Sequence, residues 1–222
     1  MSSERFLEIL SLLPEATFET VYMTFTATAF ACLLGFPLGV YLYTASPAGL
    51  APRRLPYAAA SQLVNLFRSI PFIILMVLLI PVTRAIVGTS IGPTAAIVPL
   101  SIAAAPFVAR VTEAALSEVD LGVITAAKAM GSTNLQIIRK VLIPEAMPAL
   151  VSGLALTVIN LIAYSAMAGA IGGRGLGDLA IRFGFHRFQT DVTVAAVVVI
   201  LILVQGVQLA GTLVSRRLLS RR

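Results

Sequence analysis

The sequence predicts an all-α membrane protein with five transmembrane helices. Of its 222 residues, 58% are hydrophobic and only 12% are charged, whereas about a quarter of the residues in a soluble domain carry a charge. The mean hydropathy is +0.96, and long uncharged runs separate the charges. Crossings of about 20 residues each would use most of the chain. We therefore expect one transmembrane domain over residues 1–222.

The first expected element is a short amphipathic helix ahead of the first crossing. Residues 4–13 mix charged and apolar residues, and both Glu4 and Glu8 are acidic. A secretory signal would instead begin with basic residues and continue into a short apolar core. We expect this segment to lie at the membrane surface and to end near Pro14.

Four crossings follow from the spacing of the charges. The uncharged runs 20–52, 85–109, 146–173 and 192–215 each exceed the length that a crossing needs. They predict spans at about 18–44, 90–116, 146–168 and 192–215.

The remaining span, at about 57–83, depends on a shorter run. Residues between Arg68 and Arg84 would form only about 22 Å of helix, less than the ~30 Å of a hydrocarbon core. A helix that also includes the preceding apolar segment would span if it tolerates Arg68 and Pro71. Arg68 is then either a functional cation facing a cavity or an anchor that reaches the cytoplasmic interface.

The basic residues predict the orientation. With five spans and a cytoplasmic C-terminus, twice as many Lys and Arg residues lie on the cytoplasmic side as outside, which favours an outer N-terminus. The cytoplasmic set is Arg53, Arg54, Arg110, Lys128, Arg139, Lys140, Arg216, Arg217, Arg221 and Arg222.

Charge and motifs exclude several function classes. The net charge of +6 comes mostly from Arg at the edges of apolar runs, so we expect no nucleic-acid partner. The glycine-rich stretch 169–177 follows an apolar helix and lacks a Lys-Ser or Lys-Thr pair, so it is not a phosphate-binding loop. His186 and Cys32 have no neighbours that suggest a catalytic triad or a metal site. We expect no catalytic residue, no metal and no cofactor on this chain.

Because the spans are built on uncharged runs, we expect no carboxylate inside the membrane spans. A proton-driven pump needs buried acidic groups as a relay. The sequence therefore favours a chain that takes its driving force from a partner.

The loop 118–145 has the pattern of a docking element. Gly131 can supply a left-handed stop to one short helix, and Ser132 or Thr133 can cap a second one before Pro144 breaks it. Such a helix with a small apolar face suits a groove on a soluble partner. The expected apolar face contains Val123, Ile124, Ala127 and Met130.

At these residues the chain resembles the coupling loop of ABC importer permeases, whose pattern is EAA, three residues, G, nine residues, I, one residue, LP. The spacing matches throughout, with differences at Thr125, Val141 and Ile143. The resemblance implies a cytoplasmic coupling helix that contacts an ATPase. The implied residues are Thr125, Ala126, Ala127, Lys128, Met130, Gly131 and Pro144.

Further strings resemble the permease subunit of bacterial methionine importers over roughly residues 15–215. They are Asn65-Leu-Phe-Arg-Ser-Ile-Pro-Phe-Ile-Ile74, Ile86-Val-Gly-Thr-Ser-Ile-Gly92, Ala105-Pro-Phe107, Tyr164-Ser-Ala-Met167 and Gly175-Leu-Gly177. This resemblance implies a type I ABC importer permease bundle in the bacterial inner membrane. It also implies a homodimer, two cytoplasmic ATPase subunits that bind ATP and Mg²⁺, and an extracytoplasmic methionine-binding protein.

Two further groups of residues are candidates for function. Asn160 and Tyr164 share a helix face that would line a translocation path, with Ser165 and with Met167 as a gate, or would form interhelical hydrogen bonds. The outer segment with Arg174, Asp178, Arg182 and Arg187 would face the binding protein, or would be a solvated loop. Gly35 and Gly39 form a GxxxG pair that we assign to helix packing.

The sequence thus predicts a non-catalytic permease that imports methionine by alternating access. The alternatives are import of another amino acid or small metabolite, an ATP-independent secondary transporter or channel, and a membrane scaffold without transport.

Overall fold

The structure is a computed structural model that describes residues 3–220, with side chains from residue 9 onward. Every regular element in this range is a helix, so the all-α prediction is confirmed. Arg221 and Arg222, which contribute to the predicted orientation, lie outside the described residues.

The first helix, α1 (Ser3–Ala45), runs without interruption through Pro14 and Pro37. The predicted end near Pro14 is therefore wrong. A proline removes one backbone hydrogen bond from a helix, but in an apolar environment ending the helix would leave more backbone groups without partners.

The GxxxG pair places α1 directly on α5 (Pro93–Ser117). A Cβ atom added at Gly35 would collide with the carbonyl oxygen of Ala105, and one at Gly39 with that of Ala109. The packing role predicted for the two glycines is confirmed, because only glycine allows this approach.

The continuous helix predicted over 57–83 is wrong. The segment consists of α2 (Arg54–Ser69), α3 (Phe72–Leu78) and α4 (Ile80–Val87), and α2 and α3 diverge by 100°. Ile70 before Pro71 is extended, with φ −78° and ψ 123°, because the proline ring disfavours helical backbone in the preceding residue.

Within residues 3–220, four helices are long and apolar enough to cross a membrane, and the bent pair α2–α3 would make a fifth span. The four long segments are Ile9–Ala45, Pro93–Ser117, Asn134–Gly173 and Thr190–Leu219. The last of these is α10 (Thr190–Leu219), and the third contains α8 (Ile143–Ala168).

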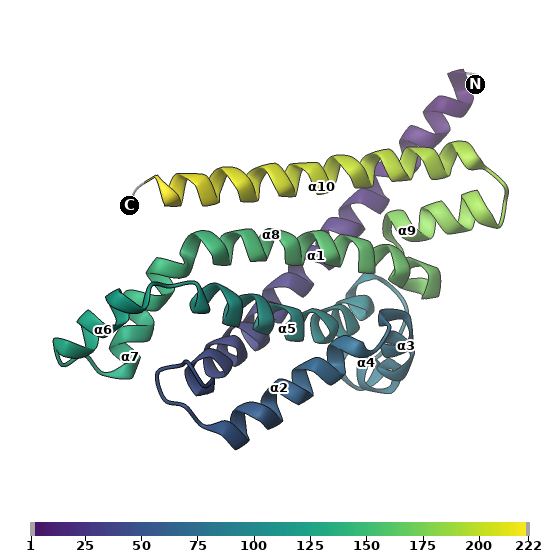
Figure 1. Cartoon of the computed structure of the whole chain (residues 1–222). Coiled ribbons are helices and arrows are strands. Elements are labelled where there is room, and N and C mark those ends of the chain that lie inside the picture. The colour runs from purple at the N-terminus through teal and green to yellow at the C-terminus, as the bar shows by residue number, and fades with distance from the viewer. Residues whose placement is uncertain (1–2, 221–222) are drawn as a thin grey trace.

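The helices form one bundle (Figure 1). In it, α10, α8 and α5 run side by side, and α1 crosses behind α8 and α5. The central core joins Met23 and Ala27 of α1 to Leu100 and Ala104 of α5 and Leu161 of α8. The short helices α6 (Leu121–Ala129) and α7 (Asn134–Ile137) lie at the same end as the C-terminus, whereas the N-terminus and α9 (Gly175–Leu179) lie at the opposite end.

Candidate functional site

The predicted docking loop contains the two helices α6 and α7. The Asp120 side chain caps α6 by accepting a hydrogen bond from the backbone nitrogen of Gly122. Gly131 ends the helix with a φ of +78°, and the Ser132 nitrogen donates to the Ala127 oxygen at 3.2 Å. This geometry is a glycine C-cap, so the stop predicted at Gly131 is confirmed.

The second helix begins with a capping box at Thr133. The Gln136 nitrogen donates to Thr133 Oγ1 at 3.3 Å, and the Thr133 nitrogen donates to Gln136 Oε1 at 2.8 Å. Of the two predicted caps, Thr133 is therefore the one used.

The predicted break at Pro144 is wrong. A π-helical turn, η1 (Ile138–Leu142), joins α7 to α8, and Pro144 occupies the first turn of α8. The wider π turn accommodates the proline ring, which would clash with a carbonyl four residues earlier in a regular α-helix. The α7 part of the docking loop and the span after it are consequently one continuous helix.

Of the apolar face predicted for α6, two residues are buried against the bundle and two are exposed. Ile124 and Ala127 are buried, with exposed fractions of 4% and 3%. They pack in a cluster with Leu116 and Leu142 of the neighbouring helices. Ala127 therefore fastens α6 to the bundle, although the resemblance assigns it to the ATPase contact.

The exposed surface of the segment is apolar at several positions. Met130 is 79% exposed, Leu121 68% and Leu135 63%. Val123, Thr125, Ala126 and Lys128 are also exposed, and so is Pro144. We call the exposed set Leu121, Val123, Ala126, Met130 and Leu135 the docking face.

Asn160 and Tyr164 line one cavity of about 250 Å³ at the break between α2 and α3. The Tyr164 ring stacks on Phe72, with ring centroids 4.7 Å apart and an interplanar angle of 5°. The cavity also contains Arg68, so the structure brings together two of the predicted path residues and the intramembrane arginine.

Ser165 and Met167 do not line this cavity. Ser165 is buried, and its hydroxyl donates to the Ile162 carbonyl at 2.7 Å. This hydrogen bond lies within α8 and does not join two helices. Met167 is 47% exposed and lies about one turn beyond Tyr164 on α8.

The outer segment surrounds α9, between the π-helical turns η2 (Gly169–Gly173) and η3 (Ala180–Phe185). Glu19 and Thr20 of α1 accept hydrogen bonds from the first two nitrogens of α9, at Gly175 and Leu176, each at 2.9 Å. The carboxylate of Glu19 also lies 3.5 Å from Arg174. These contacts hold the segment on α1.

Three of the four predicted outer residues line one hollow of about 310 Å³, and they are Arg174, Asp178 and Arg182. Arg182 pairs with Asp178 at 3.0 Å. Arg187 lies apart from this hollow, with its guanidinium 4.8 Å from the centroid of the Phe183 ring.

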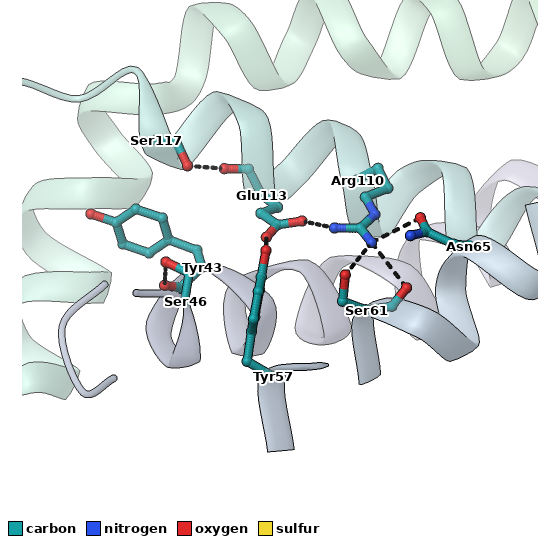
Figure 2. Close-up of polar contacts among 8 residues, drawn as sticks. All are labelled: Tyr43, Ser46, Tyr57, Ser61, Asn65, Arg110, Glu113 and Ser117. Atoms are coloured by element: carbon teal, nitrogen blue, oxygen red, sulfur yellow. Dashed lines mark hydrogen bonds and ion pairs between the residues drawn. The ribbon is translucent and has the colours of Figure 1, made fainter. Parts of the chain in front are cut away.

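A polar network that the sequence reasoning missed joins α2 to α5 (Figure 2). Arg110 donates to Glu113 Oε2 at 2.6 Å, to Ser61 Oγ at 2.6 Å and to Asn65 Oδ1 at 2.9 Å. Tyr57 donates to Glu113 Oε1 at 3.1 Å. The i,i+3 spacing of Arg110 and Glu113 was the available signal.

The expectation that the spans hold no carboxylate is wrong for the predicted span 18–44, which contains Glu19, and for the predicted span 90–116, which contains Glu113. The Glu113 side chain is only 13% exposed and is engaged by Arg110. Among the described residues, no group of three or more His, Cys, Asp or Glu side chains is placed to hold a metal ion.

Comparisons with known proteins cover almost the whole chain. The family described as "Binding-protein-dependent transport system inner membrane component" matches residues 35–220. The probable D-methionine transport system permease protein MetI of Vibrio cholerae is 52% identical over 206 residues, which are 93% of this chain and 92% of that protein. The corresponding protein of Pasteurella multocida is 46% identical over 91% of this chain and 93% of its own length.

A solved structure described as inward-facing conformations of the MetNI methionine ABC transporter contains a similar chain. The TM-score is 0.93 and the sequence identity 46%, with 98% of this chain and 99% of that chain covered.

Proposed function

The chain belongs to the family of binding-protein-dependent transport system inner membrane components, and on that premise we propose that it is the permease of a methionine importer. It is a transport component of a membrane complex and has no catalytic role of its own. The observation that carries the proposal is the docking face, a set of exposed apolar side chains on the two short helices α6 and α7 and the turn between them. A separate ATPase would engage this surface.

The proposed complex has two copies of this chain, two ATPase subunits and an extracytoplasmic binding protein that delivers methionine. ATP and Mg²⁺ bind to the ATPase subunits, and no cofactor binds to this chain. We place the N-terminus outside and the C-terminus in the cytoplasm of the bacterial inner membrane. In support, α6, α7 and the C-terminus share one end of the bundle, and α9 and the N-terminus share the other.

The proposed mechanism is alternating access driven by the ATPase. Closure of the two ATPase subunits on ATP would move the docking faces together and open the bundle toward the binding protein, and hydrolysis would reverse the movement. The residues that transmit the movement are Thr125, Ala126, Ala127, Lys128, Met130, Gly131 and Pro144. Those of the path are Asn160, Tyr164, Ser165 and Met167, and those that face the binding protein are Arg174, Asp178, Arg182 and Arg187.

Transport by the reconstituted complex tests this proposal. Vesicles that contain the permease, its ATPase and the binding protein should import L- and D-methionine only when ATP is supplied on the ATPase side. A permease without ATPase subunits should neither hydrolyse ATP nor import methionine.

Other results would favour the alternatives. Import by the permease alone, driven by an ion gradient, would indicate a secondary transporter. Import of a different amino acid would change the substrate, and no import of any compound would favour a scaffold.

A further inference from the structure

The cavity at the break between α2 and α3 lies near mid-depth along α5. Ala103 and Phe107 line it from the central part of α5, which begins at Pro93 and ends at Ser117. Each lies about 15 Å along the helix axis from the nearer end of α5. A cavity at this depth between broken and continuous helices is a common position for a transported solute.

Arg68 is the charged group in this cavity, and it lies in the last turn of α2. It follows Arg54, at the start of α2, by 14 positions, so it lies about 21 Å along the helix from that end. An arginine side chain is much shorter than this distance. The interpretation of Arg68 as an anchor at the cytoplasmic interface therefore loses support.

The two arginines near the contact of α2 with α5 differ in their partners. Arg110 donates hydrogen bonds to Glu113, Ser61 and Asn65. Arg68 is exposed and has no hydrogen-bond or ion-pair partner among the side chains described, residues 9–220. Charged groups inside a membrane domain are costly unless they are paired or hydrated, so the Arg68 guanidinium is available to an anionic group.

The other walls of the cavity complement the guanidinium. Asn160 and Tyr164 contribute an amide and a phenol, and neither polar group has a partner within the described part of the chain. Phe67, Phe72 and Phe107 contribute aromatic rings. An arginine binds a carboxylate with two parallel hydrogen bonds, an amide oxygen accepts from an ammonium group, and aromatic rings favour an apolar or thioether side chain.

We infer that this cavity is a binding site within the permease for a zwitterionic amino acid with an apolar side chain. Arg68 binds its carboxylate, Asn160 its ammonium group, and the rings of Phe72 and Tyr164 its side chain. The cavity of about 250 Å³ is smaller than the 300–1,000 Å³ of pockets for drug-sized ligands, so its size suits a single amino acid. The assignment rests on the proposed function, because it takes the ligand to be the transported solute.

The test measures ligand binding to the permease–ATPase complex in lipid nanodiscs without the binding protein. Tritiated L-methionine is the probe, and scintillation proximity reports saturable binding. L-Norleucine, which keeps the carboxylate and an apolar side chain, should compete. L-Methioninol, in which an alcohol replaces the carboxylate, should not compete at the same concentrations.

Variants localise the site. Arg68→Gln should weaken binding at least about tenfold, which corresponds to ~1.4 kcal/mol. Arg68→Lys should weaken it less, because lysine keeps the charge but loses the two-pronged geometry. Asn160→Leu, of similar size, should also weaken binding. Arg84→Gln is the matched control, because Arg84 lies on α4 outside the cavity, and it should bind as the wild type does.

Wild-type affinity in Arg68→Gln, or equal competition by L-methioninol, would overturn the assignment. So would the absence of saturable binding in a wild-type complex that imports methionine once the binding protein and ATP are added. If Arg68→Gln does not assemble, Asn160→Leu and the competition series decide the question. A wild-type complex that binds methionine at this site but imports nothing contradicts the proposed function and leaves the site in place.

Discussion

Neighbouring alanines in α6 allow docking to be separated from folding. Ala126 is exposed, whereas Ala127 is 3% exposed and packs in the cluster that contains Tyr43, Leu116 and Leu142. Ala126→Asp and Ala127→Asp introduce the same carboxylate one residue apart. We expect Ala126→Asp to leave the permease intact and to abolish its binding to the ATPase.

The expected magnitudes follow from the two environments. At Ala127 a carboxylate would be buried among apolar side chains, which costs about 3 kcal/mol or more when no partner is present. A helix of nine residues is marginal without its packing, so α6 should detach from the bundle. At Ala126 the carboxylate stays in water in the free permease. Its desolvation opposes only the binding of the ATPase, which would cover the docking face.

Three measurements on the purified variants test the pair. Thermal unfolding in detergent should show a lower midpoint for Ala127→Asp and an unchanged one for Ala126→Asp. Size-exclusion chromatography with the ATPase should show no complex for Ala126→Asp. Methionine import should be lost in both. A stable Ala126→Asp variant with normal import would refute the docking face, and a wild-type midpoint for Ala127→Asp would refute the burial of α6.

Three further predictions concern backbone and side-chain packing. Gly131→Ala should cost about 1 kcal/mol, because no atom lies within 4 Å of the added Cβ and only the φ of +78° opposes it; a thermal midpoint that falls as far as that of Ala127→Asp would contradict this. Glu113→Ala should destabilise the contact of α2 with α5 by about 1–3 kcal/mol, because Arg110 and Tyr57 lose their partner; Glu113→Gln should recover part of the loss in denaturation experiments. Gly35→Ala should lower the thermal midpoint, because the added Cβ collides with the Ala105 carbonyl. Gly206→Ala in α10 should leave the midpoint unchanged or raise it, because no atom lies within 4 Å of the added Cβ. Equal midpoints for the two variants would show that α1 does not approach α5 so closely.

The sequence was sufficient where local rules determine structure. Gly131 and Thr133 were identified because a left-handed stop and a helix cap depend on a few neighbouring residues. The GxxxG pair was interpreted correctly for the same reason. The prolines show the limit of such rules. The sequence indicated a helix break at Pro14 and at Pro144, but the helix continues through both. It indicated that a helix continues through Pro71, but the helix ends there.

Tertiary contacts account for the other differences. Charge spacing places Glu113 in a span but cannot show that Arg110, Tyr57 and the residues of α2 surround it. The period of α6 identifies an apolar face but cannot show which part of it the chain buries at Ala127. The cavity at Arg68 depends on a bend of 100° that Pro71 alone does not specify.

The helix that begins at Asn134 continues through η1 and α8 to Ala170, before the non-helical backbone of Ile171 and Gly172, and at 1.5 Å per residue it forms a rod about 55 Å long. Gly153, whose missing side chain admits Val111 of α5, lies near its middle and is a natural fulcrum. A rigid rod turned about its middle moves its two ends in opposite directions. Displacement of α7 at one end therefore moves Asn160, Tyr164 and the start of η2 in the opposite direction. The helix is not broken at Pro144, so no bend there reduces this movement.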